Sequence, residues 1–175
     1  MTDPQTSATE LCAMVESVFS VDGVLARADP HYQPREGQLA MAQAVAHAMG
    51  AGEVLVAEAG TGVGKTYAYL VPALLSGERV LLSTATKALQ DQLFSRDIPR
   101  LVQALEVPVR VALLKGRSSY LCLHRLGMAR HAVGGESPQQ IRVLAKIEEW
   151  SRSTRSGDLS ELTGLDDRSP VIPWV

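Results

Sequence analysis

A glycine-rich segment, AGTGVGKT at residues 59–66, constrains the fold of this chain more than any other feature of its sequence. It follows the short apolar run VLVAEA (54–59) and precedes a helical pattern that begins near Gly64. Because a glycine inside regular structure costs roughly 0.5–1 kcal/mol, a cluster of glycines suggests that the backbone itself is a binding surface. Successive backbone N–H groups can bind phosphate oxygens, and the start of the following helix adds its positive dipole end.

Lys65 and Thr66 close this segment and indicate which ligand it binds. In a phosphate-binding loop of this kind, the lysine reaches the outer phosphates of ATP and the next hydroxyl binds Mg²⁺. The strict pattern has glycine at the position of Ala59, and the alternative is a glycine-rich turn without a ligand. Lys65 and Thr66 are the predicted catalytic residues, and the predicted nucleotide contacts of the loop are Ala59, Gly60, Thr61, Gly62, Val63, Gly64, Lys65 and Thr66.

Apolar runs alternate with helix-sized segments through the middle of the chain. The runs VLVAEA (54–59), RVLLSTAT (79–86) and VRVALLKG (109–116) are predicted to be buried strands. Since parallel strands are joined by right-handed crossovers that contain a helix, this order predicts an α/β fold with a mostly parallel sheet. A helix is expected over residues 87–106, with an interruption at Pro99.

A second pair of polar residues precedes the loop. Arg35 and Gln38 lie one helical turn apart at the start of an Ala-rich helical pattern over residues 35–49. A guanidinium and an amide at this spacing can read the edge of an adenine through two-sided hydrogen bonding. The alternative is a solvated first turn of the helix.

The segment LLSTATKALQDQL (81–93) ends the second expected strand and opens the next helix. Hydroxyl side chains and free N–H groups at a helix start are good contacts for the phosphate backbone of a nucleic acid, although they are equally typical of helix caps. Residues 87–130 carry eight Lys/Arg against three acids, whereas residues 1–30 carry one arginine against five acids. This asymmetry indicates either a nucleic-acid surface or a solvated one.

Two features of the composition bear on the cell compartment. The sequence has no run of eighteen apolar residues, and its start, MTDPQTSATE, does not follow the pattern of a signal peptide. We therefore expect a cytoplasmic protein without a membrane partner. Cys12 and Cys122 lie far apart and form no disulfide framework, which is typical of a reducing compartment.

Four segments, YQPREGQ, EAGTGVGKTYAYLVPAL, STATKALQDQL and ALLKGRSSYLC, together resemble the opening motifs of the iron-sulfur DNA helicases of superfamily 2, the XPD/DinG group. The resemblance is strong over about residues 32–122. It implies a RecA-like P-loop motor domain, adenine recognition by Arg35 and Gln38, and Cys122 as the first of four cysteines that hold a [4Fe-4S] cluster. It further implies contacts with single-stranded DNA from Thr84, Thr86, Lys87, Gln90, Lys115, Arg117 and Tyr120.

The resemblance divides the chain into an N-terminal helix and loop (1–30), the first part of RecA-like motor domain 1 (31–116) and the start of an iron-sulfur cluster domain (117–175). In the last segment, Ser137 is a candidate helix N-cap. The sequence lacks an acidic Mg²⁺ motif after a buried strand, a second motor domain and three of the four cluster cysteines. The chain is therefore expected to be an N-terminal fragment, inactive alone, with Cys122 as a free thiol.

The resemblance implies that the complete protein is an ATP-dependent DNA helicase, moving 5′ to 3′ along single-stranded or forked DNA in DNA repair or the damage response. The expected cofactors are ATP, Mg²⁺ and a [4Fe-4S] cluster, and the expected partners are DNA and replication or repair proteins. Two alternatives stay open. One is another P-loop ATP-binding enzyme, such as a small-molecule kinase that is indifferent to DNA, and the other is a short non-catalytic nucleotide-binding module.

Overall fold

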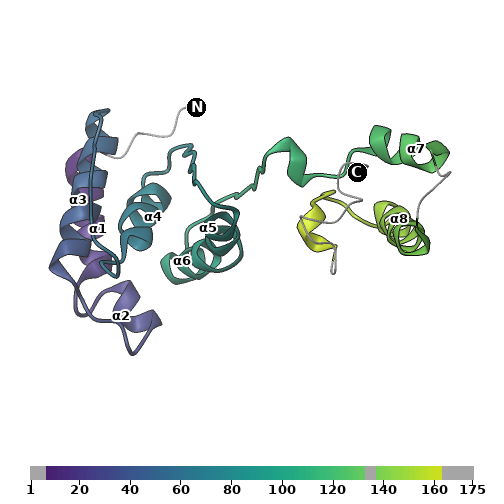
Figure 1. Ribbon diagram of the computed structural model, residues 1–175. Helices are drawn as coiled ribbons and strands as arrows, with labels where there is room; N and C mark the ends of the chain where they lie inside the picture. Colours follow the sequence, from purple (N-terminus) through teal and green to yellow (C-terminus); the bar gives the residue numbers. More distant parts are fainter. Residues whose placement is uncertain (1–6, 133–136, 163–175) are drawn as a thin grey trace. The chain divides into compact units, whose positions relative to one another are not determined.

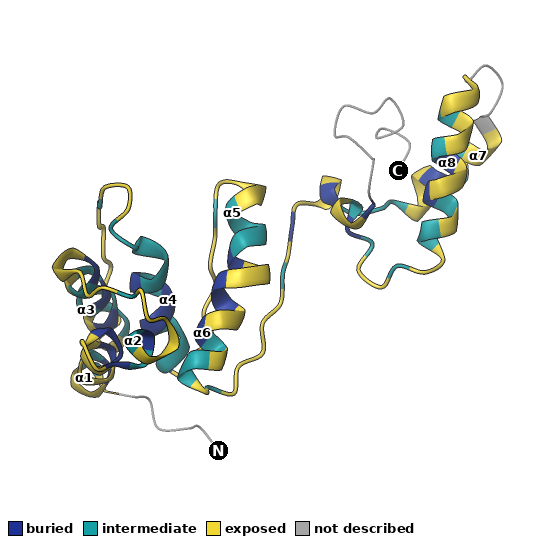
Figure 2. Ribbon diagram, turned by 90° about the horizontal axis from the view of Figure 1, so that it is seen from below, coloured by how far each residue is buried: buried dark blue, intermediate teal, exposed yellow. Residues whose placement is uncertain are grey.

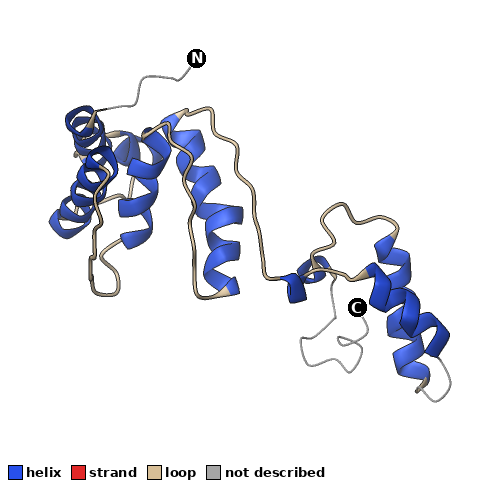
Figure 3. Ribbon diagram, turned by 90° about the horizontal axis from the view of Figure 1, so that it is seen from above, coloured by secondary structure: helices blue, strands red, loops and turns tan. Residues whose placement is uncertain are grey.

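The computed structural model describes residues 7–132 and 137–162 of the 175-residue chain. The chain divides into two compact units, Met1–Ala112 and Leu113–Val175, and each is described by itself. Regular structure in the described residues is helical, and no strand forms among them (Figure 1, Figure 3). Their one β-type pairing is an isolated antiparallel bridge between Tyr120 and Asp158.

The first unit is a set of helices packed around one apolar core. Helices α1, α3 and α4 pack against one another, and α6 packs against α2 and α4. Figure 2 shows buried residues along the sides on which these helices meet. The elements in chain order are α1 (Ala8–Phe19), α2 (Val24–Ala28), α3 (Glu36–Ala51), α4 (Lys65–Leu75), α5 (Lys87–Gln92), the π-helix η1 (Leu93–Asp97) and α6 (Ile98–Leu105).

Local sequence explains how α1 and α3 begin, end and pack. Ser7 and Glu10 form a capping box at the start of α1, in which Ser7 Oγ accepts from the N–H of Glu10 at 3.2 Å. Helix α3 ends at Gly52, whose φ of +67° suits glycine. The two helices pack closely at Gly50, where a Cβ atom would lie 2.4 Å from the Cα of Ala8. Small residues at this crossing therefore set the distance between α1 and α3.

The predicted parallel sheet is wrong. The three expected strands, 54–59, 79–86 and 109–116, are segments without strand pairing in the described chain, and apolar side chains such as Val56 and Leu81 are each 93% exposed. A strand is stable only beside partner strands about 4.7–4.9 Å away that take up its N–H and C=O groups. An apolar run indicates a preference for extended, buried backbone, but it does not indicate which segment would be its partner strand. The α/β, RecA-like fold class is thus corrected to an all-helical one for the described residues.

The second unit has a smaller core around Leu126, Leu144, Ile147 and Leu162. Its described elements are the 3₁₀-helix η2 (Arg117–Ser119), α7 (Leu123–Ala132), α8 (Pro138–Ser151) and the 3₁₀-helix η3 (Leu159–Glu161). Ser137 caps α8 as predicted, and Gln140 completes the capping box. The end of the expected cluster domain, 163–175, lies outside the described residues.

None of the helices in the described part of the chain combines the length and the apolar character that a membrane crossing requires.

Candidate functional site

The glycine-rich segment forms the loop that enters α4. Gly62 and Gly64 have φ angles of +81° and +90°, in the left-handed region that glycine adopts readily. These turns make Lys65 the first residue of α4 and Thr66 the second. Backbone N–H groups in the first turn of a helix lack intrahelical partners and carry the positive end of the helix dipole. The loop and the start of α4 therefore form an arrangement that favours an anion.

The Lys65 side chain folds back over this loop. Its Nζ donates to the carbonyl oxygens of Ala59 at 2.7 Å and Gly60 at 2.6 Å. Both acceptors are neutral, so these contacts do not neutralise the positive charge. Since a charged donor binds an anionic oxygen more strongly than a neutral one, a phosphate can displace the two carbonyls.

Helix α3 holds the same loop through two side chains. Arg35, the N-cap of α3, donates from Nη1 to the carbonyl oxygen of Gly62, and Gln38 Nε2 donates to that of Gly64 at 2.9 Å. Gln38 is only 6% exposed. The fit is so close that a Cβ atom on Gly64 would lie 2.1 Å from Gln38 Nε2. The structure thus brings both residues predicted to read adenine against the glycine-rich loop, and Gln38 is not part of a solvated turn.

The residues at the start of α5 form a local cap. Thr86 is the N-cap, and its Oγ1 accepts from the N–H of Leu89 at 3.3 Å. Thr84 Oγ1 donates to the carbonyl oxygen of Thr86 at 3.2 Å. Lys87 is exposed and Gln90 is partly buried. The capping role of Thr86 is confirmed, while the DNA contacts of these residues remain predictions.

Lys115, in the second unit, is engaged in a buried ion pair. Its Nζ lies 2.8 Å from Asp158 Oδ2 and donates to Ser160 Oγ at 3.0 Å, and its backbone N–H donates to the hydroxyl of Tyr120 at 2.9 Å. Burial alone would raise the pKa of Asp158, but hydrogen bonds from Lys115 and Ser160 bring this pKa below its usual value. A phosphate approaching Lys115 would have to compete with this carboxylate.

Arg117 and Cys122 lie on either side of Tyr120. Arg117 is exposed, and Cys122 is a partly buried free thiol just before α7. The described residues contain no group of three or more His, Cys, Asp and Glu side chains arranged to hold a metal ion. A [4Fe-4S] cluster takes four cysteine ligands, so the described residues do not by themselves fit this cofactor.

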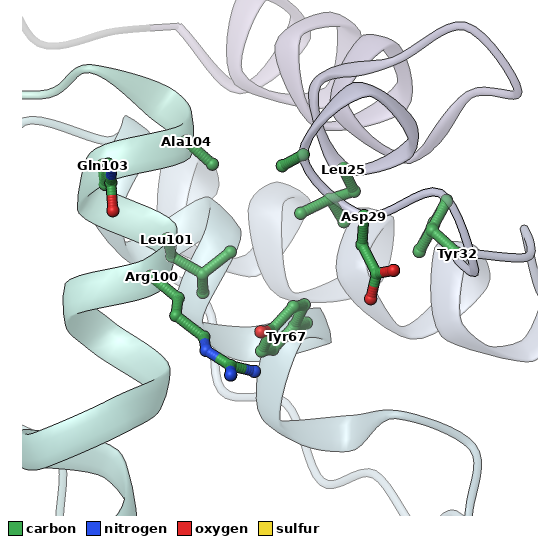
Figure 4. A pocket seen from close by; sticks show the side chains of 9 residues that line it. Leu25, Asp29, Tyr32, Tyr67, Arg100, Leu101, Gln103 and Ala104 are labelled. Atoms are coloured by element: carbon green, nitrogen blue, oxygen red, sulfur yellow. The ribbon is translucent and has the colours of Figure 1, made fainter.

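A pocket of about 650 Å³ opens in the first unit between α2, α4 and α6 (Figure 4). The Arg100 side chain extends toward Tyr67 in this pocket, and none of residues 59–66 lines it. Sequence reasoning missed it because its lining comes from helices that are distant along the chain. The polar and aromatic side chains that line it are Asp29, Tyr32, Tyr67, Arg100 and Gln103.

Sequence reasoning also missed a buried carboxylate next to α4. Asp97 is 4% exposed and accepts hydrogen bonds from Gln92 and Arg96. The available signal was local: Gln92 and Asp97 stand five residues apart, just before Pro99. That spacing does not suit one face of a regular α-helix.

The chain matches known proteins over most of its length. The family model described as DEAD/DEAH box helicase matches residues 39–150. The ATP-dependent DNA helicase YoaA of Escherichia coli (strain K12) is 50% identical over 158 residues, which cover 90% of this chain and 25% of the relative. The ATP-dependent helicase DinG of Mycobacterium tuberculosis (strain H37Ra) is 44% identical over 157 residues, 77% of this chain and 24% of the relative. The chain therefore spans about a quarter of the length of these relatives.

A more distant relative is named for a different activity. The 3′-5′ exonuclease DinG of Bacillus subtilis (strain 168) is 35% identical over 137 residues, 76% of this chain and 15% of the relative. No solved structure matches the chain.

Proposed function

Since the chain belongs to the DEAD/DEAH box helicase family, we propose that it is the nucleotide-binding part of an ATP-dependent DNA helicase. The resemblance of its motif segments to the DinG helicases, and among them to YoaA, is confirmed by the relatives. In this proposal the complete protein acts in the cytoplasm and couples ATP hydrolysis to 5′ to 3′ movement along single-stranded or forked DNA during DNA repair.

One observation carries the proposal. Lys65 Nζ donates hydrogen bonds to two neutral carbonyl oxygens, at 2.7 and 2.6 Å, and Lys65 lies where the glycine-rich loop meets the start of α4. ATP phosphates bind the loop N–H groups and the start of α4, and Lys65 moves from its carbonyl contacts to the β and γ phosphates. Thr66 supplies its hydroxyl to Mg²⁺, which when bound neutralises charge on these phosphates. Arg35 and Gln38 keep the loop in place and, in the same proposal, face the adenine.

The proposed DNA contacts in the first unit lie at the start of α5 and comprise Thr84, Thr86, Lys87 and Gln90. Arg117 and Tyr120 are proposed contacts in the second unit. Lys115, also predicted from the sequence to lie near DNA, is engaged by Asp158, so we propose that its side chain stabilises the second unit and does not bind phosphate directly. Membership of a helicase family speaks against a small-molecule kinase.

Substitution of Lys65 tests the nucleotide site. In the complete gene product, Lys65→Ala should lower ATP turnover and DNA unwinding at least about a hundredfold, because it removes the cation beside the outer phosphates. The matched control is Lys146→Ala, which removes an exposed lysine from α8 and should leave both activities unchanged. If Lys65→Ala keeps ATP turnover within about threefold of the wild type, the loss is far smaller than removal of one such group should cause, and the assignment is overturned.

A separate test addresses the iron-sulfur cluster. Cys122 offers one sulfur ligand, so three further ligands have to come from residues other than those described. Complete protein purified without oxygen should then contain about four irons per chain, and Cys122→Ser should lose them. Cys12→Ser, which removes the other free thiol, should retain the iron. Iron-free wild-type protein with full unwinding activity would refute the cluster and leave the proposal for Lys65 intact.

A further inference from the structure

The helix that runs from Lys87 to Leu105 contains one wide turn, the π-helix η1 at Leu93–Asp97. The backbone N–H of Ile98 donates to the carbonyl of Leu93, five residues earlier, which is the π-helical hydrogen bond. Pro99 explains why the regular ladder breaks here, because proline has no N–H and its ring excludes the carbonyl four residues before it. Single π turns inside α-helices are rare and occur frequently at functional sites.

The Asp97 carboxylate joins the two ends of this turn. Its Oδ2 accepts from Gln92 Nε2 at 2.7 Å, and its Oδ1 accepts from Arg96 Nε at 2.9 Å. On an α-helix, neighbouring side chains are three or four residues apart, whereas Gln92 and Asp97 are five apart. The pair meets because the turn is π-helical, and it would separate if the turn became α-helical.

Asp97 is buried, at 4% exposure, although most aspartates lie at the surface. A buried carboxylate needs both hydrogen bonds and a charge partner, and an apolar residue of similar size is often more favourable at such a place. Both requirements are met here from within one helix, by Gln92 and Arg96. The carboxylate is therefore best explained by the turn geometry that it fixes.

Helix α4, which carries the phosphate-loop lysine, packs beside this turn through α6. Tyr69 lies one turn along α4 from Thr66. Burial raises the pKa of the Tyr69 hydroxyl, a hydrogen bond with the Thr66 side chain lowers it, and the negative charge of Asp97 raises it. Tyr69 therefore lies near enough to Asp97 for the charge of the carboxylate to reach it, which agrees with the packing of η1, α6 and α4.

We propose that Asp97 is a positioning residue that holds η1 in its π-helical form and so sets the rotation of α5 relative to the phosphate-loop helix α4. A π turn contains one residue more than an α turn. If the turn became α-helical, the register of α5 would therefore shift by one residue, which rotates α5 by about 100° about its axis. The residues that move are those at the start of α5, including Thr86 and Gln90. This inference rests on the proposed function, because these residues are its DNA contacts, and it makes the π turn the element through which DNA binding and the nucleotide site affect each other.

The test uses the complete gene product and compares ATP turnover without DNA and with saturating single-stranded DNA. Asp97→Leu replaces the carboxylate with an apolar side chain that needs no hydrogen-bond partner when buried, so the π turn is free to become α-helical. We expect the stimulation by DNA to fall by about five- to tenfold, the range expected for a coupling residue, with turnover in the absence of DNA unchanged within about twofold. The control Asp22→Leu, at an exposed aspartate before α2, should leave the stimulation unchanged.

A reciprocal exchange separates the turn geometry from general damage. Gln92→Glu alone places two carboxylates together and should also lower the stimulation. Gln92→Glu combined with Asp97→Asn restores one donor and one acceptor in reversed roles and should recover the stimulation to within about twofold of the wild type. Amide hydrogen exchange over residues 93–98 should become faster in Gln92→Glu and return to the wild-type rate in the exchanged pair.

The outcomes distinguish this inference from the function on which it rests. If Asp97→Leu keeps full stimulation, or if turnover with and without DNA falls equally and the exchange does not rescue it, the positioning role is overturned. If the wild type is not stimulated by DNA at all, the proposed helicase function is overturned, and with it the role of the π turn. Unchanged hydrogen exchange over residues 93–98 in Gln92→Glu would overturn the turn-holding contact by itself.

Discussion

Two lysines, one in each unit, show how differently the same side chain can be used. Lys65 and Lys115 each stand beside a glycine, and both are predicted to bind a ligand: Lys65 the outer phosphates of ATP, and Lys115, from the family resemblance, single-stranded DNA. Lys65 Nζ contacts only neutral carbonyls in its two hydrogen bonds, at 2.7 and 2.6 Å. Lys115 Nζ lies 2.8 Å from the Asp158 carboxylate, with 3% of its side chain exposed.

The partner of a lysine, and not its local sequence, determines whether the lysine is available to a ligand. A lysine on neutral carbonyls gains from exchanging them for phosphate, because the new acceptor is charged. A lysine in a buried ion pair loses a carboxylate when it leaves, and the carboxylate is then buried without a counter-charge. Lys65 is therefore suited to binding, and Lys115 is suited to holding the second unit together.

The two lysines should differ most in their contribution to stability. Lys115→Met should lower the free energy of unfolding of the second unit by about 3 kcal/mol, because it leaves Asp158 without its partner. Lys65→Met should leave this transition unchanged. Urea unfolding followed by Trp150 fluorescence, in a Trp174→Phe background, reports on the second unit because Trp150 packs against its core.

The double variant Lys115→Met with Asp158→Leu shows whether the unpaired charge, and not the change in side-chain shape, causes the loss of stability. It removes both charges and should recover most of the loss, since apolar residues of similar size often replace a buried ion pair without penalty. If the double variant is as unstable as Lys115→Met, the ion pair is not the cause of the difference between the two lysines.

The glycines beside the two lysines provide a second, smaller contrast. Gly64→Ala should weaken ATP binding about tenfold and cost about 1–2 kcal/mol, since its φ is +90° and a Cβ would lie 2.1 Å from Gln38 Nε2. Gly116→Ala should be nearly neutral, because Gly116 has φ of −61° and a Cβ there meets nothing within 4 Å. Titration with a fluorescent ATP analogue and thermal unfolding measure the two effects.

Equal effects of the two glycine substitutions would break the contrast. They would show that the loop before α4 does not depend on its left-handed backbone.

The smallest expected effect concerns acid pH. The folded-state pKa of Asp158 lies below its ordinary value, so its carboxylate stabilises the second unit at neutral pH, and this contribution is lost as pH falls through the folded-state pKa. The stability gap between the wild type and Asp158→Asn should therefore narrow as the pH is lowered below the ordinary aspartate pKa of about 3.9. Lys65→Met should follow the wild-type curve throughout. A gap that stays constant with pH would contradict the assigned role of Asp158.

Local features of this protein could be predicted from its sequence because they depend on few residues. The glycine-rich turn and the start of α4 follow from Gly62, Gly64 and Lys65, and the cap of α8 follows from Ser137. The helix expected over 87–106 forms as α5, η1 and α6, with its irregularity just before Pro99. Caps, turns and proline breaks act within one or two helical turns, so the sequence contains most of the information about them.

Long-range features could not be predicted in the same way. The apolar run around Val56 has the composition of a strand, but without a partner strand it remains unpaired and 93% exposed. The ion pair joins Lys115 and Asp158, which are 43 positions apart, and the sequence around neither residue predicts it. Asp97 was overlooked because its importance depends on a turn whose hydrogen bonds are not regular.

Membership of a helicase family, the loop before α4 and the two residues that follow it, Lys65 and Thr66, are encoded locally in the sequence. These depend on residue type and short spacing. The contact of Gln38 with the loop, the ion pair of Lys115 with Asp158 and the hydrogen bond of Asp97 across the π turn become visible only in the folded chain. The physical reason is that the availability of a charge depends on which groups surround it in space, and the folded chain brings those groups from distant positions or through an irregular turn.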